Sequence, residues 1–244
     1  MEYDGTTFAG FQWQANLPSI QGALESAVSK ATGESPRITA AGRTDAGAHA
    51  FGQVIAFTLD SRLDDATLLN AMNAYLPEQV ALRSLETVDA DFDPRRWART
   101  REYNYLVLNC PTRSPLWHER AHHVRTPLDL DAMRQASVHF FGVHDFSAFA
   151  TPSDGGDSAV REIFSIEISR DGDLIAFRIV GNAFLQHMIR TLVGALVQVG
   201  EGKYSPDHVD TILKSQDRRN APPPVPACGL YLMNVTYGKE KHRP

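Results

Sequence analysis

The sequence predicts an α+β protein in which the element order β-α-β-β-α-β occurs twice. The first observation behind this prediction is the pattern of apolar residues, in which short strand-like stretches alternate with stretches of helical spacing. The second is composition, since 43% hydrophobic and 22% charged residues in a chain of 244 are typical of a globular protein. We therefore expect two ferredoxin-like (βαββαβ) halves with antiparallel strands, an N-terminal α+β domain at 1–102 and a C-terminal one at 103–244.

The first half contains two predicted helices. Residues 19–32 place apolar side chains at helical spacing, Ser19 caps the start and Gly33 ends the helix. A second helix is predicted at 65–76 and stops at Pro77. Short apolar stretches predict strands at 1–4, 37–41, 53–58 and 79–88.

The second half repeats this order with longer elements. Residues 103–109 alternate as a strand, and Asp171-Gly172 joins two further stretches as a hairpin. Ser205 and Pro206 are typical of a helix start. The remaining predictions are helices at 129–141, 182–199 and 206–216, strands at 160–169, 173–180 and 229–237, and loops at 110–128 and 151–159.

Charge and cysteine content exclude several classes of protein. A net charge of −5 argues against a protein that simply coats nucleic acid. We expect no secretory signal, because the residues 1–5 show neither a basic stretch nor an apolar one. We also expect no membrane span, because no apolar run approaches the roughly 20 residues that a span needs. Cys110 and Cys228 are far apart and form no CxxC pair, so we expect a reduced, cytoplasmic setting. His118, His122 and His123 lack an accompanying carboxylate motif, so no metal site is predicted.

Four arginines lie close together in the stretch 93–101, with a tryptophan among them. Such a basic stripe with an interleaved aromatic ring is typical of a surface that meets phosphates. A solvated connector held by salt bridges explains the same pattern equally well. The residues are Arg95, Arg96, Trp97, Arg99 and Arg101.

The loop Ala41-Gly42-Arg43-Thr44-Asp45-Ala46-Gly47 is the strongest candidate for chemistry. It joins two predicted strands, and its glycines permit tight turns. It brings a cation, a hydroxyl and a carboxylate within three consecutive residues, and a rigid turn between strands is a good mount for a catalytic group. The alternative is a structural turn in which Asp45 bonds its own backbone.

Two other stretches offer polar groups in apolar surroundings. Tyr103 and Tyr105 lie on one face of a predicted strand, either as base-stacking rings or as half-buried structural residues. On the predicted helix 182–199, Arg190 shares a narrow polar stripe with Asn182, Gln186 and His187. An arginine in so apolar a helix needs a partner, and a carboxylate is the obvious one.

Together these residues resemble the TruA family of tRNA pseudouridine synthases. The match follows the family order over nearly the whole chain, and the stretch Gly42-Arg43-Thr44-Asp45-Ala46-Gly47 is its most specific part. Phe11 stands where the family often has Trp, Ala48 replaces a common Val, and family members usually carry more residues before Tyr3. The matching segments are 3–6, 8–10, 19–21, 41–49, 101–105, 144–149, 161–163, 182–194 and 229–232.

The resemblance implies the pseudouridine synthase fold and an enzyme that converts uridine to pseudouridine in the anticodon stem-loop of tRNA, at positions 38 to 40. It implies a homodimer that needs no cofactor or metal. Asp45 matches the family's essential aspartate, and Arg43 the arginine that draws the target base out of the stem. Tyr103 matches the tyrosine that stacks on the base, and Arg190 the basic residue that pairs with the catalytic carboxylate.

Two other functions compete with this interpretation. A non-catalytic RNA-binding or chaperone protein on the same scaffold would have no need of a carboxylate facing RNA phosphates. A small-molecule enzyme that used the glycine loop for phosphate would need the loop to open a helix, and this loop joins strands. The chemistry expected of Asp45, Tyr103 and Arg190 therefore favours the synthase.

Overall fold

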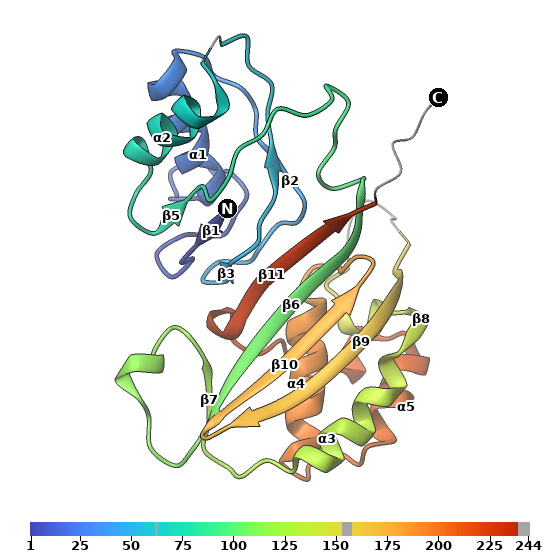
Figure 1. Cartoon of the computed structure of the whole chain (residues 1–244). Helices are drawn as coiled ribbons and strands as arrows, with labels where there is room; N and C mark the ends of the chain where they lie inside the picture. The colour runs from blue at the N-terminus through green and yellow to red at the C-terminus, as the bar shows by residue number, and fades with distance from the viewer. Residues whose placement is uncertain (62, 153–157, 239–244) are drawn as a thin grey trace. The chain divides into compact units, whose positions relative to one another are not determined.

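The computed structural model describes residues 1–61, 63–152 and 158–238. The chain forms two compact units (Figure 1), one of Met1–Arg99 with the C-terminal segment from Tyr231, the other of Thr100–Leu230. The C-terminal strand β11 (Leu230–Tyr237) is grouped with the first unit because Tyr231 and Leu232 pair in parallel with β3 of that unit. The division into two domains after residue 102 stays a prediction, since a compact unit need not be an independently folding domain.

The first unit has short strands and two helices. Strands β5, β1 and β3 pair antiparallel, whereas β2 and β4 form a separate antiparallel pair. The elements are β1 (Glu2–Tyr3), α1 (Ile20–Thr32), β2 (Thr39–Ala40), β3 (His49–Ala50), β4 (Ile55–Ala56), α2 (Asp65–Tyr75) and β5 (Val80–Ala81).

Both helices of the first unit lie where the sequence predicts them. Ser19 caps α1 by accepting a hydrogen bond from the backbone N–H of Gly22, at 3.2 Å. Gly33 ends α1 with a φ of 80°, a left-handed conformation that suits glycine. Asp64 caps α2, which ends before Pro77.

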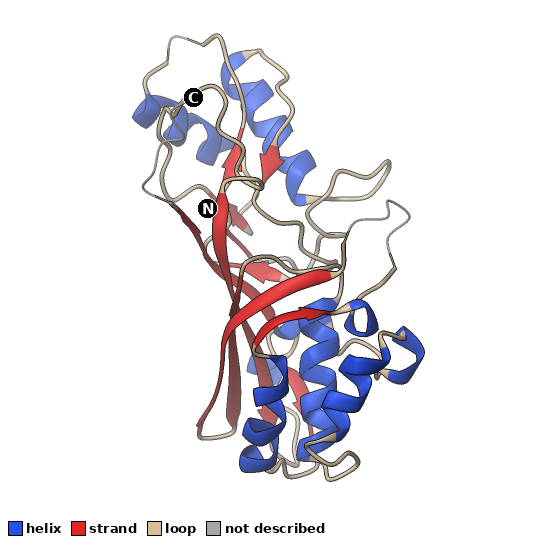
Figure 2. Ribbon diagram, turned by 90° about the vertical axis from the view of Figure 1, so that its right-hand side faces the viewer, coloured by secondary structure: helices blue, strands red, loops and turns tan. Residues whose placement is uncertain are grey.

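The second unit is an antiparallel sheet with helices on one face (Figures 1 and 2). Its strands run in the order β6, β10, β9 and β8, and β7 pairs in parallel with β6. The elements are β6 (Ala98–Asn109), β7 (His122–Val124), α3 (Leu130–Ser137), β8 (Gly142–Asp145), β9 (Val160–Asp171), β10 (Leu174–Gly181), α4 (Met188–Gly200) and α5 (His208–Ser215). Short 3-10 turns lie at Pro115–Trp117, Val138–Phe140, Ser147–Phe149, Arg218–Asn220 and Ala227–Gly229.

Helix α4 forms the centre of the second unit's core. All of its residues are buried except Arg190 and Gln198, which are partly exposed. Fully buried rings of Phe140, Phe146 and Phe149 add to this core. Arg190 therefore lies in the first turn of a helix that is buried over almost all of its length.

The α+β class with largely antiparallel strands is confirmed, and several boundaries are corrected. The predicted helix 182–199 begins only at Met188, because the Asn182 side chain accepts hydrogen bonds from the N–H groups of Glu162 and Ala183. The predicted helix 206–216 begins at His208, and the predicted helix 129–141 continues beyond Ser137 only as a 3-10 turn.

Three short strands, β3, β7 and β8, were not predicted, since two to four residues are too few for a clear alternation. Conversely, the strand predicted at 79–88 is formed only by Val80–Ala81. Of the predicted loop 151–159, residues 153–157 lie outside the described residues. None of the described helices has the length and apolar character to cross a membrane.

Candidate active site

Asp45 lies in the first unit, in the loop between β2 and β3. Asp45 is partly exposed, Arg43 is exposed and Thr44 is 8% exposed. Residues Ala46 and Gly47 form a turn in which Gly47 has a φ of 80°, and the Ala48 N–H donates to the Asp45 carbonyl oxygen at 3.1 Å. Asp45 thus lies at the start of a closed, hydrogen-bonded turn.

The N-terminal segment holds this loop from one side. The Tyr3 hydroxyl hydrogen-bonds the Thr44 Oγ1 atom at 2.8 Å, and the Phe11 N–H donates to the Thr44 carbonyl oxygen at 3.0 Å. Burial raises the pKa of Tyr3 to about 12, so the hydroxyl stays protonated at neutral pH. Asp45 therefore follows directly on a residue that is fixed through both its side chain and its backbone.

Gly10 allows the N-terminal segment to approach the loop closely. Its φ is 100°, and a Cβ atom added there would lie 2.9 Å from the Thr44 carbonyl oxygen. It would also lie 3.2 Å from the Ala46 nitrogen, on the other side of Asp45. A side chain at position 10 would therefore push against the backbone that carries Asp45.

Two buried polar residues that follow the loop in the sequence make further contacts, Gln53 with the loop and His49 with the N-terminal segment. Gln53, 1% exposed, donates from Nε2 to the Gly42 carbonyl oxygen at 2.8 Å. The ring of His49, 2% exposed, stacks on Tyr231 at 4.7 Å, and its Nδ1 atom lies 3.1 Å from the Gly5 nitrogen. Neither residue was predicted from the sequence to have a role, although a polar glutamine at the start of the apolar stretch 53–58 is typical of a buried hydrogen-bonding residue.

Arg95, Arg96 and Arg99 are exposed in the first unit. The Asp93 carboxylate accepts hydrogen bonds from the backbone N–H groups of Arg95 and Arg96, at 2.8 and 3.0 Å. These two bonds hold the pKa of Asp93 below its usual range, and the bond from Arg96 has the larger effect. The segment is a hydrogen-bonded turn with its guanidinium groups at the surface. This arrangement fits both a surface that meets phosphates and a solvated connector.

Arg101 does not share the surface of this cluster. It is 7% exposed, and its Nη1 atom donates to the Asn182 carbonyl oxygen at 2.7 Å. Because β6 alternates, Arg101, Tyr103 and Tyr105 share its buried face. The arginine is structural within the second unit, although its spacing from Arg99 gave no sign of this.

Tyr103 and Arg190 both belong to the second unit. Tyr103 is 6% exposed, and its ring meets Phe184 edge-on at 5.3 Å, so a base can stack on it only if the ring becomes more accessible.

Arg190 lies in the first turn of α4, and its Nε atom donates to the Val225 carbonyl oxygen at 2.6 Å. The predicted polar stripe is wrong as a helical feature, since Asn182, Gln186 and His187 precede the helix. The pairing of Arg190 with Asp45 stays a prediction.

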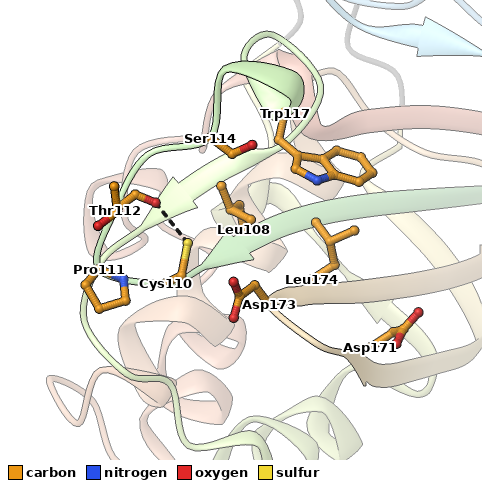
Figure 3. Close-up of a pocket in the computed structure, with 9 residues that line it drawn as sticks. All are labelled: Leu108, Cys110, Pro111, Thr112, Ser114, Trp117, Asp171, Asp173 and Leu174. Atoms are coloured by element: carbon orange, nitrogen blue, oxygen red, sulfur yellow. Dashed lines mark hydrogen bonds between the residues drawn. The ribbon is translucent and has the colours of Figure 1, made fainter.

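A pocket of about 550 Å³ lies elsewhere, at one end of the second unit's sheet (Figure 3). It contains none of the predicted site residues, and its two carboxylates would repel phosphate. Among the described residues, no three His, Cys, Asp or Glu side chains are grouped so that they could hold a metal ion. The pocket is lined by Leu108, Cys110, Pro111, Thr112, Ser114, Trp117, Asp171, Asp173 and Leu174.

Comparison with known proteins identifies the family. A family model described as tRNA pseudouridine synthase matches residues 1–95 and 136–238, which is more than half of the chain. The chain belongs to the tRNA pseudouridine synthase family. Its matched segments include the Asp45 loop and α4, whereas Tyr103 lies in the unmatched stretch between them.

Similar members of the tRNA pseudouridine synthase family come from several bacteria. A tRNA pseudouridine synthase A from Pelobacter propionicus is 41% identical over 237 residues, 97% of each chain. The protein of the same name from Myxococcus xanthus is 44% identical over 97% of this chain and 90% of its own length. The one from Brevibacillus brevis is 39% identical over 97% of each chain. The predicted resemblance is confirmed, and so is the predicted class of enzyme, an isomerase that acts in tRNA pseudouridylation.

Proposed function

We propose that this synthase converts uridine to pseudouridine at positions 38 to 40 of the tRNA anticodon stem-loop, with Asp45 as its catalytic carboxylate. The observation that supports the assignment of Asp45 is the hydrogen-bonded backbone of the loop that carries it. The backbone of Thr44 and Asp45 is held by Phe11 and Ala48, while Asp45 as a residue is partly exposed. A catalytic group fixed in this way is available to a substrate without further ordering of the loop.

The reaction needs a carboxylate and little else. The bond between N1 and C1′ of the nucleotide breaks, the uracil turns, and a bond forms between C5 and C1′. The proton at C5 leaves while N1 gains one, so atoms and charge balance without an oxidant, a reductant or water. Asp45 acts either at C1′ or by removing a sugar proton, and neither route requires a metal or cofactor.

The other predicted residues have roles in presenting the base. A base must leave its stack before it can react, at a cost of a few kcal/mol. Exposed Arg43 is suited to enter the stem and displace the target base. The Tyr103 ring, once it becomes accessible on RNA binding, supplies stacking worth about 1–3 kcal/mol per base. Arg190 is proposed to pair with the catalytic carboxylate, as the family resemblance implies, and so to offset its negative charge.

Replacement of Asp45 by Asn tests the central assignment. We expect Asp45→Asn to abolish pseudouridine formation on unmodified tRNA while melting temperature and tRNA affinity stay near those of the wild type. Asp60→Asn is the matched control, because Asp60 is an exposed carboxylate of the same unit. Near-normal turnover by Asp45→Asn would disprove the assignment, and mapping the product positions tests the anticodon stem-loop as the target.

The exposed cluster of Arg95, Arg96 and Arg99 is proposed to contact the tRNA backbone. Each phosphate contact contributes about 0.7–0.9 to the slope of log affinity against log salt concentration. Replacing all three by Ala should therefore weaken binding and lower that slope by about 2–3. An unchanged slope in filter binding would exclude this cluster from the interface.

Three broader features complete the proposal. We expect a homodimer, and light scattering on a size-exclusion column measures its mass. We expect the enzyme in the cytoplasm, where its substrate is found, and fractionation of cells tests this. Activity should also survive treatment with a chelator, because the isomerisation involves no redox step and no hydrolysis.

A further inference from the structure

A proline-rich segment packs against α4 next to Arg190. Residues 222–226, called here the proline strap, run along the helix where Gly194 leaves room. A Cβ atom added at Gly194 would lie 3.1 Å from the Pro223 carbonyl oxygen and 3.5 Å from a methyl group of Val225. The strap is therefore in direct contact with the helix that carries Arg190.

Arg190 and Val225 are joined by two hydrogen bonds. The Arg190 Nε–H donates to the Val225 carbonyl oxygen at 2.6 Å, and the Val225 N–H donates to the Arg190 carbonyl oxygen at 3.2 Å. A guanidinium group is planar, so the direction of its Nε–H bond restricts the plane of the whole group. The position of the Val225 carbonyl group thus helps to set where the two terminal nitrogens of Arg190 point.

Tyr105 fixes the proline strap at Pro226, the residue after Val225. Its hydroxyl group donates to the Pro226 carbonyl oxygen at 2.7 Å. Its ring is fully buried and packs beside Gly229, where an added Cβ atom would lie 2.8 Å from the ring. Burial, together with nearby Cys228, raises the pKa of Tyr105, so the hydroxyl remains a proton donor.

We propose that Tyr105 is a positioning residue for Arg190, acting through the proline strap. The Tyr105 hydroxyl holds Pro226, the adjacent Val225 carbonyl group holds the Nε atom of Arg190, and the guanidinium plane is fixed as a result. The inference rests on the proposed function of Arg190 in catalysis. It gives a role in the reaction to a tyrosine that touches neither substrate nor reacting atoms.

Tyr105→Phe tests this positioning role, because it removes the hydroxyl and keeps the ring. We expect kcat on unmodified tRNA to fall about 10- to 100-fold, the size of loss that small displacements of catalytic groups produce. The KM for tRNA should stay within about twofold, since the lost interaction acts on the chemical step. Tyr237→Phe is a matched control, because the Tyr237 hydroxyl likewise donates to a proline carbonyl oxygen, that of Pro94, at 2.9 Å.

A second measurement does not depend on activity. The Nε–H proton of Arg190, identified in NMR spectra by its loss in Arg190→Lys, should exchange with water faster in Tyr105→Phe than in the wild type. In Tyr237→Phe its exchange rate should be unchanged. The combination of a lower kcat and faster Nε–H exchange, specific to Tyr105→Phe, is the result expected.

Either of two results would overturn the inference. One is a kcat that is unchanged in Tyr105→Phe or equally reduced in Tyr237→Phe, and the other is an unchanged rate of Nε–H exchange. Failure of the proposed function is distinguishable, because Arg190→Lys or Asp45→Asn would then retain wild-type kcat. If both of those variants are slow and Tyr105→Phe is not, the positioning role alone is wrong.

Discussion

The hydrogen bond between Tyr3 and Thr44 can be removed by a single atom change, Tyr3→Phe. The Tyr3 hydroxyl is buried and lies 2.8 Å from the Thr44 Oγ1 atom and 3.4 Å from the Gln53 Nε2 atom. Losing a buried bond and leaving its partner unsatisfied costs about 1–3 kcal/mol. For a chain of this size each kcal/mol lowers the melting temperature by about 2–4 °C. We expect a fall of about 2–12 °C and a lower kcat, because the Asp45 loop loses an anchor.

The same variant should change how stability depends on pH. In the unfolded chain Tyr3 loses its proton near its ordinary pKa of 10.0, but in the folded chain this pKa is about 12. The resulting stabilisation, about 2–3 kcal/mol, is fully present below pH 10 and is lost as the pH rises to about 12. Tyr3→Phe lacks the titrating group, so its stability should fall less steeply in that range.

Urea unfolding at about pH 9 and about pH 11 measures this difference. Thr44→Val is the matched control, since it removes the partner hydroxyl and leaves Tyr3 buried and able to titrate. The control should lose stability and kcat as Tyr3→Phe does, but keep the wild-type fall with pH. If Tyr3→Phe loses as much stability as the wild type between the two pH values, the assignment of this titration to Tyr3 is wrong.

Two further substitutions test the geometry around the site. Gly10→Ala should lower the free energy of unfolding by about 1–3 kcal/mol and reduce kcat. The reason is that alanine is strained at a φ of 100° and its Cβ would press on the Thr44 carbonyl oxygen. A change in the free energy of unfolding below about 0.5 kcal/mol would contradict this. Arg101→Leu should destabilise the protein by about 1–3 kcal/mol, since the Asn182 carbonyl oxygen loses its donor, yet leave the salt dependence of tRNA binding unchanged. A lower salt slope in filter binding would instead place Arg101 in the RNA interface.

Local signals predicted helices well where a cap and a stop were both in the sequence. The limits of α1 follow from Ser19 and Gly33, and α2 ends before Pro77. The start of α4 was misplaced by six residues, because the apolar spacing continues through 182–187 while the Asn182 side chain bonds the backbone of Glu162 and Ala183. Spacing along the chain contains no information about a hydrogen bond to a residue twenty positions away.

The family, the enzyme class and the α+β architecture were determined by the sequence alone, because the Asp45 loop and its companion segments are specific and in order. The tertiary structure decided what holds that loop. Tyr3, Gly10 and Gln53 act on it from up to 41 residues away in the chain. It also decided that Arg101 is buried while Arg95, Arg96 and Arg99 are exposed. Burial and anchoring arise from contacts between distant segments, whereas spacing and caps act within a few residues.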